Sequence, residues 1–164
     1  MEGKMDGRIG GRFAGFDIHV TFDGQRITGR MGGRVNGKDF DLEFDGSSLR
    51  GRWGGTAAGK DMECAIDGHR LDGRFGGRFG GHDIHLTEQE GSIAGRCGGS
   101  VGGFDVTFTC DPGGRLYGRM GGRIGGKDLE AQIEKFPPLV AATLAAAVHW
   151  EMELEAASHS AGNP

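Results

Sequence analysis

The sequence predicts a mainly β protein: a closed, up-and-down barrel of twelve antiparallel strands made from six hairpin repeats, with a C-terminal helix filling the lumen. Three observations predict this fold. A glycine-rich unit recurs every 22 residues, the apolar residues within each unit alternate with period two, and one apolar, alanine-rich segment follows the last unit. A fixed period indicates a repeat architecture, and alternation with period two indicates strands.

The repeat unit begins with glycine and has aspartate at its eleventh place. Its pattern is Gly-Arg-φ-Gly-Gly-Arg-φ-x-Gly-x-Asp-φ-x-φ-x-φ, where φ is apolar, followed by a turn such as Asp23-Gly24. We expect the six units to occupy residues 5–134 of a single domain, residues 1–164. The units start at Gly7, Gly29, Gly51, Gly73, Gly95 and Gly118, with one residue inserted near Pro112.

Each unit reads as a β-hairpin. In the second unit the apolar positions change parity after Asn36-Gly37, and a two-residue turn with glycine between alternating runs is a strong hairpin signal. Opposite charges then meet outside, and large side chains cover glycines inside. Folding about this turn pairs Arg34 with Asp39, Gly33 with Phe40, Met31 with Leu42, and Arg30 with Glu43.

The charges decide between this hairpin meander and a parallel solenoid with one unit per coil. A solenoid would stack Arg30 on Arg52 on Arg74, and like charges directly opposite each other destabilise a sheet. Hairpins place each arginine opposite an acid instead. An open meander would leave two unpaired edges and one wet apolar face, so we expect the sheet to close.

Residues 138–156 predict the helix, and residues 157–164 a disordered tail. Only Thr143 interrupts the apolar run from Leu139 to Val148, and a helix that is apolar on all sides needs burial on all sides. The run is about 18 Å long, too short to span a membrane. Residues 148–155 also alternate as a strand would, which remains an alternative. Beyond the run we expect the carboxylates to lie in water: Glu151, Glu153 and Glu155.

This architecture resembles the tubby-like and phospholipid-scramblase group, whose twelve-stranded barrel closes around a hydrophobic C-terminal helix. The resemblance is one of plan and covers nearly the whole chain, but no signature residue matches. The stretch from Asp45 to Trp53 is also faintly similar to a MORN repeat, with the glycine turn placed differently. Both groups include binders of phospholipid head groups, which implies a lipid partner without assigning residues to it.

Composition excludes several functions. The formal charge of −4 argues against a nucleic-acid partner, and no basic region followed by an apolar run opens the chain as a signal peptide would. The three cysteines show no metal-ligand spacing, and no nucleophile–base–acid set is present. We therefore expect a cytoplasmic monomer without enzymatic activity or cofactor. The histidines, including His19 and His85, are interpreted as solvated surface residues that bind no metal.

The predicted register localises one candidate site, an anion-binding patch at His85, Arg96 and Arg119. In this register most arginines face an acid, whereas Arg96 faces His85 and Thr109, and Arg119 also lacks a carboxylate opposite it. Unpaired guanidinium groups on a rigid sheet suit a phosphate or an anionic head group. The function we expect is a non-enzymatic binding or structural module that recognises anionic phospholipid or phosphate on the outer wall. The alternative is a carrier of a hydrophobic ligand in the barrel lumen.

Overall fold

A computed structural model of the chain describes residues 2–11, 15–32, 37–54, 59–76, 80–99, 102–121 and 126–161, with side chains in the last segment up to residue 157. The described residues form twelve strands and one helix. Their bounds are β1 (Gly3–Ile9), β2 (Phe16–Phe22), β3 (Arg26–Gly32), β4 (Gly37–Phe44), β5 (Ser48–Trp53), β6 (Lys60–Asp67), β7 (Arg70–Phe75), β8 (His82–Gln89), β9 (Ser92–Cys97), β10 (Phe104–Cys110), β11 (Arg115–Met120), β12 (Lys127–Glu134) and α1 (Pro138–Ala161).

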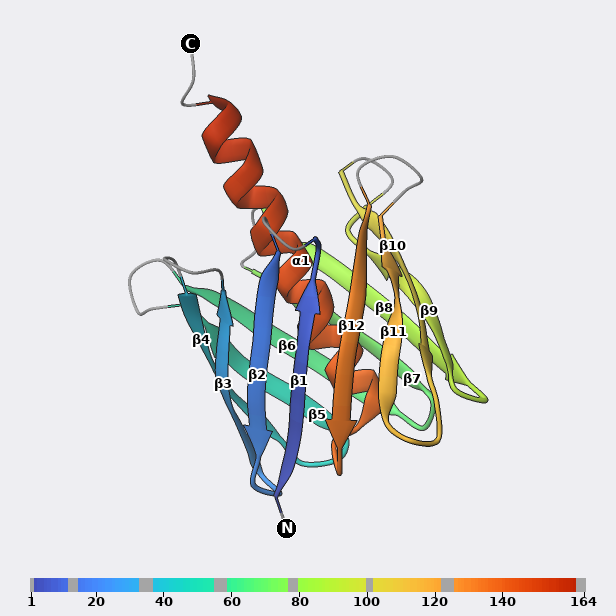
Figure 1. Ribbon diagram of the computed structural model, residues 1–164. Helices are drawn as coiled ribbons and strands as arrows, with labels where there is room; N and C mark the ends of the chain where they lie inside the picture. Colours follow the sequence, from blue (N-terminus) through green and yellow to red (C-terminus); the bar gives the residue numbers. More distant parts are fainter. Residues whose placement is uncertain are drawn as a thin grey trace.

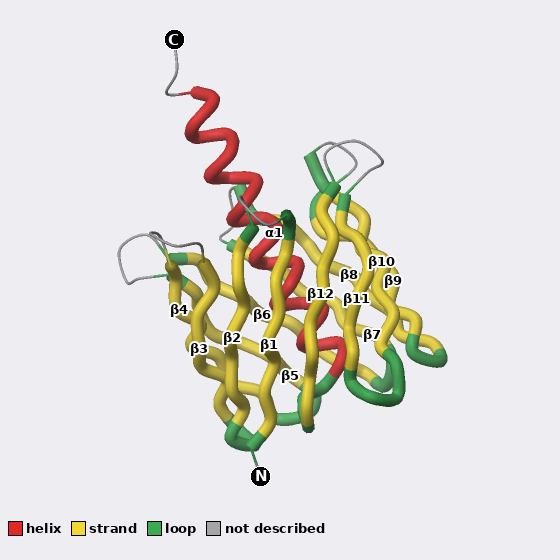
Figure 2. Tube along the Cα trace, in the orientation of Figure 1, coloured by secondary structure: helices red, strands yellow, loops and turns green. Residues whose placement is uncertain are grey.

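The strands form a closed antiparallel barrel, as the repeat predicts. Each strand pairs with its neighbours in the chain, and β1 pairs with β12 to complete the circle. The helix α1 enters beside the N-terminus, runs through the barrel and projects beyond the strands at the other end (Figures 1 and 2). We call the end where α1 projects the mouth, and the other the N-terminal end. The closed sheet has no free edge, which explains why twelve short strands need no further cover.

The apolar residues of each strand point inward and form one core with α1. Along β4, for example, Phe40, Leu42 and Phe44 are buried while the residues between them are exposed. The helix fills the lumen because every residue from Leu139 to Val148 is at most 5% exposed. The hydroxyl of Thr143 donates to the Leu139 carbonyl oxygen at 2.8 Å, so it needs no partner from the wall.

The C-terminal helix is longer than predicted. It continues to Ala161, which includes five residues of the predicted tail 157–164, and residues 162–164 lie outside the described part. The strand alternative for residues 148–155 is wrong, because these residues are helical. Glutamate, methionine, leucine and alanine all favour helix, and here that preference overrides the alternation.

The register predicted about Asn36-Gly37 is wrong by four residues. In the structure β3 ends at Gly32 and β4 starts at Gly37, so Asn36, with Gly33 and Arg34, lies outside the described residues. Because the error is an even number, every side chain stays on its predicted face, and the alternation could not reveal it. The observed pairs are Arg30 with Asp39, Gly29 with Phe40, Ile27 with Leu42, and Arg26 with Glu43.

The first glycine of each unit marks a close approach of two strands. A Cβ atom built on Gly95 would lie closer than 3.0 Å to the carbonyl oxygen and Cα of neighbours on β8, which are backbone atoms that cannot turn away. A Cβ on Gly99, four residues later, meets nothing within 4 Å. Glycine therefore lets the sheet approach itself tightly at this level of the barrel.

We expect Gly95→Ala to destabilise the barrel by about 1–3 kcal/mol, because the strands must separate to accept the methyl group. Gly99→Ala is the matched control and should change the free energy of unfolding by less than about 0.5 kcal/mol. Urea denaturation measures both. Equal effects at the two positions would show that the close approach at Gly95 is not what requires glycine there.

Candidate functional site

Six side chains surround α1 where it leaves the barrel. They occupy the tenth place of each unit, point inward, and sit opposite buried residues such as Trp53 and Phe75 on the preceding strands. We call this set the mouth ring: Phe16, Lys38, Lys60, His82, Phe104 and Lys127. Three lysines and one histidine at an inward-facing level distinguish the ring from the apolar layers below it.

Glu151 of α1 is held by three donors from the wall. The Lys38 Nζ atom donates to Oε2 at 2.9 Å, and the Lys60 Nζ atom donates to Oε1 at 2.6 Å. The indole N–H of Trp53 also donates to Oε1, at 2.8 Å. The prediction that Glu151 lies in water is wrong, since it is only 2% exposed. This carboxylate fixes how far α1 is inserted and how it is rotated in the lumen.

The surroundings of Glu151 keep it ionised. Burial alone would raise the pKa of its carboxyl group, but the hydrogen bonds from Lys60, Lys38 and Trp53 outweigh burial and lower that pKa below the usual value. Hydrogen bonds to an ionised group are about twice as strong as neutral ones. The contact therefore contributes stability above the ordinary carboxyl pKa of 4.5, and that stability is lost as the pH falls through the lower folded value.

Trp150 packs into an aromatic cluster at the same level. Its ring lies 6.1 Å from the ring of Trp53 and stacks on Phe75 with centroids 6.3 Å apart. The imidazole of His82 lies 4.7 Å from the same indole, and the Lys60 ammonium group lies 5.6 Å from its centroid. The two tryptophans of the sequence therefore both report on how the helix sits at the mouth.

His149 is buried on another side of α1, with no exposed surface. Its Nε2 atom is 2.9 Å from Oε1 of Glu153, and its ring lies 4.4 Å from the ring of Phe104. Its Nδ1 atom is buried without a hydrogen-bond partner, the one such side-chain atom found in the described part of the chain. The interpretation of all histidines as solvated surface residues is therefore wrong for His149, because the apolar run of α1 carries it into the barrel.

Burial, and then the nearby charge of Lys127, lower the pKa of His149 from 6.5 to about 4. Burial likewise raises the pKa of Glu153, although Lys127 opposes this. Burial also lowers the pKa of His82, with a further contribution from Arg74. The two imidazole groups at the mouth, those of His82 and His149, therefore stay neutral at lower pH than an ordinary histidine would.

The outer wall carries a belt of ion pairs, one for each hairpin. The premise that Arg96 and Arg119 lack carboxylates is wrong: Arg96 donates to Asp105 at 2.7 Å, and Arg119 donates to Asp128 at 2.9 Å. The four-residue register error placed Thr109 where Asp105 lies. Arg34, which the predicted register paired with Asp39, lies outside the described residues. The pairs are Arg8–Asp17, Arg30–Asp39, Arg52–Asp61, Arg74–Asp83, Arg96–Asp105 and Arg119–Asp128.

The structure does bring His85 next to Arg96 across β8 and β9, as predicted. His85 is exposed, and its Nδ1 atom hydrogen-bonds to Asp72 on the other side. His19 makes the equivalent bond to Asp6 at 2.8 Å. With both arginines paired and His85 bonded to an acid, the geometric reason for an anion at His85, Arg96 and Arg119 no longer holds. Among the described residues no group of three or more side chains could hold a metal ion.

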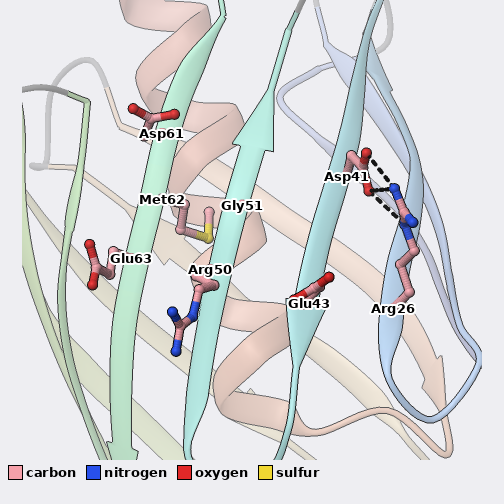
Figure 3. A pocket seen from close by; sticks show the side chains of 8 residues that line it. All are labelled: Arg26, Asp41, Glu43, Arg50, Gly51, Asp61, Met62 and Glu63. Atoms are coloured by element: carbon pink, nitrogen blue, oxygen red, sulfur yellow. Dashed lines mark hydrogen bonds and ion pairs between the residues drawn. The ribbon is translucent and has the colours of Figure 1, made fainter.

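A hollow of about 450 Å³ lies on the outer wall over β3 to β6 (Figure 3). Arg26 forms two hydrogen bonds with Asp41, at 2.8 and 2.7 Å, and Arg50 lies between Glu43 and Glu63. All these charged groups are exposed. Water solvates them well, so the hollow offers no polar group that would prefer a ligand to solvent.

The residues of the mouth were missed, although the sequence contained a signal for the ring. Lys38 stands two places before the inward-facing Phe40, so period two already placed it on the inner face. The tenth place varies among phenylalanine, lysine and histidine, and it was therefore treated as unspecified. Nothing in the sequence could connect Lys38 and Lys60 to Glu151, because that contact depends on how far α1 is inserted.

Comparisons with protein-family models, with curated proteins and with solved structures find no match for this chain. The resemblance to the tubby-like and phospholipid-scramblase group therefore stays a prediction. In the described part of the chain, no helix is long and apolar enough to cross a membrane.

Proposed function

We propose that this protein is a non-enzymatic binding module that meets a lipid surface with its mouth. The observation that carries the proposal is the projecting end of α1, which leaves the barrel beside the mouth ring (Figure 1). Leu154 lies on this projecting end and is 38% exposed, the one exposed large apolar side chain among the described residues. An exposed leucine beside lysines supplies both an apolar contact and positive charge for a membrane interface.

The charges of the two ends favour this orientation. Each of the five described turns at the N-terminal end has a carboxylate in it or at its edge: Asp23, Asp45, Asp67, Glu90 and Asp111. These carboxylates place negative charge on the turns of that end, although Arg26, Arg70 and Arg115 begin the strands that follow three of the turns. At the mouth the lysines Lys38, Lys60 and Lys127 offset the glutamates of α1. The level of three lysines in the mouth ring is the feature that favours this end as the one that faces an anionic bilayer.

The outer wall supports the proposal by exclusion. The six arginines of the belt are paired with acids on neighbouring strands, and such exposed pairs leave little net charge for a head group to neutralise. We accordingly move the proposed lipid-binding surface from the wall, where the sequence suggested it, to the mouth.

Flotation with vesicles tests the proposal. Vesicles of phosphatidylcholine with phosphatidylserine should carry the protein upward at low salt, more at pH 5 than at pH 7, because the sequence pI is 5.8 and the chain becomes cationic below it. Leu154→Ser should weaken the partition about tenfold, since completing the burial of this leucine is worth roughly 1.5 kcal/mol. Ala94→Ser on the exposed face of β9 is the matched control. No flotation at either pH would contradict a lipid-binding role.

The alternative function, a carrier of a hydrophobic ligand, requires α1 to leave the lumen it fills. Leu139 to Val148 occupy that space in the described structure, and Val140 to Val148 have no exposed surface. Mass spectrometry of an organic-solvent extract of the purified protein distinguishes the two functions. A stoichiometric lipid in the extract would favour the carrier, and its absence would favour the module with a permanent helix.

A further inference from the structure

We propose that His149 makes the mouth an acid-sensitive latch, which holds the upper part of α1 against the barrel while the imidazole is neutral and frees it when the imidazole is protonated. The freed part is the segment from His149 to Glu155, so its release also breaks the contacts that Glu151 makes with Lys38, Lys60 and Trp53. This inference rests on the proposed function, because it supplies the condition under which that segment reaches a lipid surface. It does not depend on the vesicle experiment for its own test.

The buried position of His149 in the barrel, which we call its seat, favours a neutral ring over a charged one. The ring has no exposed surface, it faces Phe104, and only its Nε2 atom has a partner, Glu153. In the neutral ring Nε2 carries the hydrogen and donates to the carboxylate, so Nδ1 needs no acceptor. Protonation adds a hydrogen to Nδ1, where no acceptor lies within reach. A buried charged donor without a partner is among the costliest groups a core can contain.

The charged neighbours of His149 do not compensate for this cost. Lys127 on β12 is positively charged and therefore disfavours a positive charge on the His149 ring. Phe104 on β10 carries no charge. Burial raises the pKa of the Cys97 thiol on β9, so this thiol stays protonated and neutral. On α1 itself Glu153 is the one counter-charge, and its own burial favours the neutral form as the pH falls. The second imidazole of the mouth, His82, resists protonation for the same reason.

The direction of the pH effect follows from linkage. In the seated helix His149 stays neutral down to about pH 4, whereas a freed imidazole has the ordinary pKa of 6.5. Between these values the freed state binds a proton that the seated state does not, so acid favours release. The difference allows the opening equilibrium to rise by up to about 300-fold across this range.

The freed segment suits a membrane interface. It carries Trp150 and Met152, both 5% exposed while seated, together with Leu154. Tryptophan is enriched at the level of lipid head groups. Below the sequence pI of 5.8 the whole chain is also cationic, so the same change that opens the latch attracts an anionic bilayer.

Tryptophan emission and far-UV circular dichroism, recorded together from about pH 8 to about pH 3.5 without lipid, test the latch. Both tryptophans lie at the mouth, so emission reports on the seat, whereas dichroism reports on the sheet. We expect the emission to shift to longer wavelength between pH 6.5 and 4 while the sheet signal persists. His149→Gln should abolish that shift, and Lys127→Gln should reduce it, because removing the cation makes protonation of the seated ring less unfavourable. His69→Gln, in an exposed turn, is the control.

Emission and dichroism that change together would overturn the latch, because they would show unfolding of the whole barrel. A shift that persists in His149→Gln would overturn it as well. If that variant does not fold, NMR titration of His149 in the natural protein decides: an imidazole that titrates near 6.5 with the tryptophans still seated contradicts the proposal. A latch that opens in vesicle-free solution without subsequent flotation would leave the inference standing and remove the lipid function. Flotation without any opening would do the reverse.

Discussion

Deleting residues 138–164 should abolish cooperative folding of the barrel. The deletion removes the ten residues from Leu139 to Val148, each at most 5% exposed, and leaves an apolar cavity through the centre of the molecule. Removing one buried leucine already costs roughly 2–5 kcal/mol, and a whole domain is stable by only about 5–15 kcal/mol. We expect a chain that aggregates or shows no thermal transition, as measured by circular dichroism and size-exclusion chromatography.

A shorter truncation gives the control for this deletion. Removing residues 158–164 leaves every described side chain of α1 in place and should leave the melting temperature unchanged within about 2 °C. A monomeric barrel with an ordinary melting temperature after the longer deletion would mean that α1 is an accessory and not the core.

Replacing Glu151 by alanine should destabilise the protein by about 3 kcal/mol. The change leaves two ammonium groups, Lys38 and Lys60, crowded together without their shared carboxylate, and it leaves the indole N–H of Trp53 without an acceptor. Urea denaturation at pH 7 measures the loss. Glu155→Ala, on the projecting part of α1, should change stability by less than about 0.5 kcal/mol.

A triple substitution separates the contribution of the contact from the cost of breaking it. Changing Lys38 and Lys60 to methionine together with Glu151→Leu removes all the charges at once, and buried ion pairs replaced by apolar residues often recover stability. We expect this variant to regain most of the loss of Glu151→Ala. If the triple variant is less stable than Glu151→Ala, the contact of Glu151 with Lys38 and Lys60 stabilises the fold by more than apolar side chains can in its place.

The sequence was sufficient for the fold because three of its signals constrain residues that are far apart in the chain. The period of the repeat determines how many hairpins form, and the alternation within β4, where Phe40 and Leu42 point inward, determines which face is core. The opposite charges of Arg30 and Asp39 exclude a parallel stack. Together these signals allow only a closed antiparallel sheet around an apolar helix.

The details that failed depend on distances the pattern does not contain. Moving a strand by four residues preserves its alternation, so only the number of residues between β3 and β4 separates the predicted register from the observed one. That error alone produced the unpaired arginines of the proposed wall site. The burial of Glu151 and His149 was missed because a helical wheel describes one helix and carries no information about the wall around it. Their environment becomes visible only once the barrel height and the insertion of α1 are known.

The most direct test of the account is amide hydrogen exchange, measured by NMR at pH 7, along the helix and the strands. If α1 is the core of the barrel, the amides from Leu139 to Val148 exchange only when the whole molecule unfolds, as slowly as those of the central residues of β4 or β10. The same free energy of opening for helix and strands is the result we predict. Helix amides that exchange orders of magnitude faster than protected strand amides would contradict it, because they would show that the barrel stands without the helix inside.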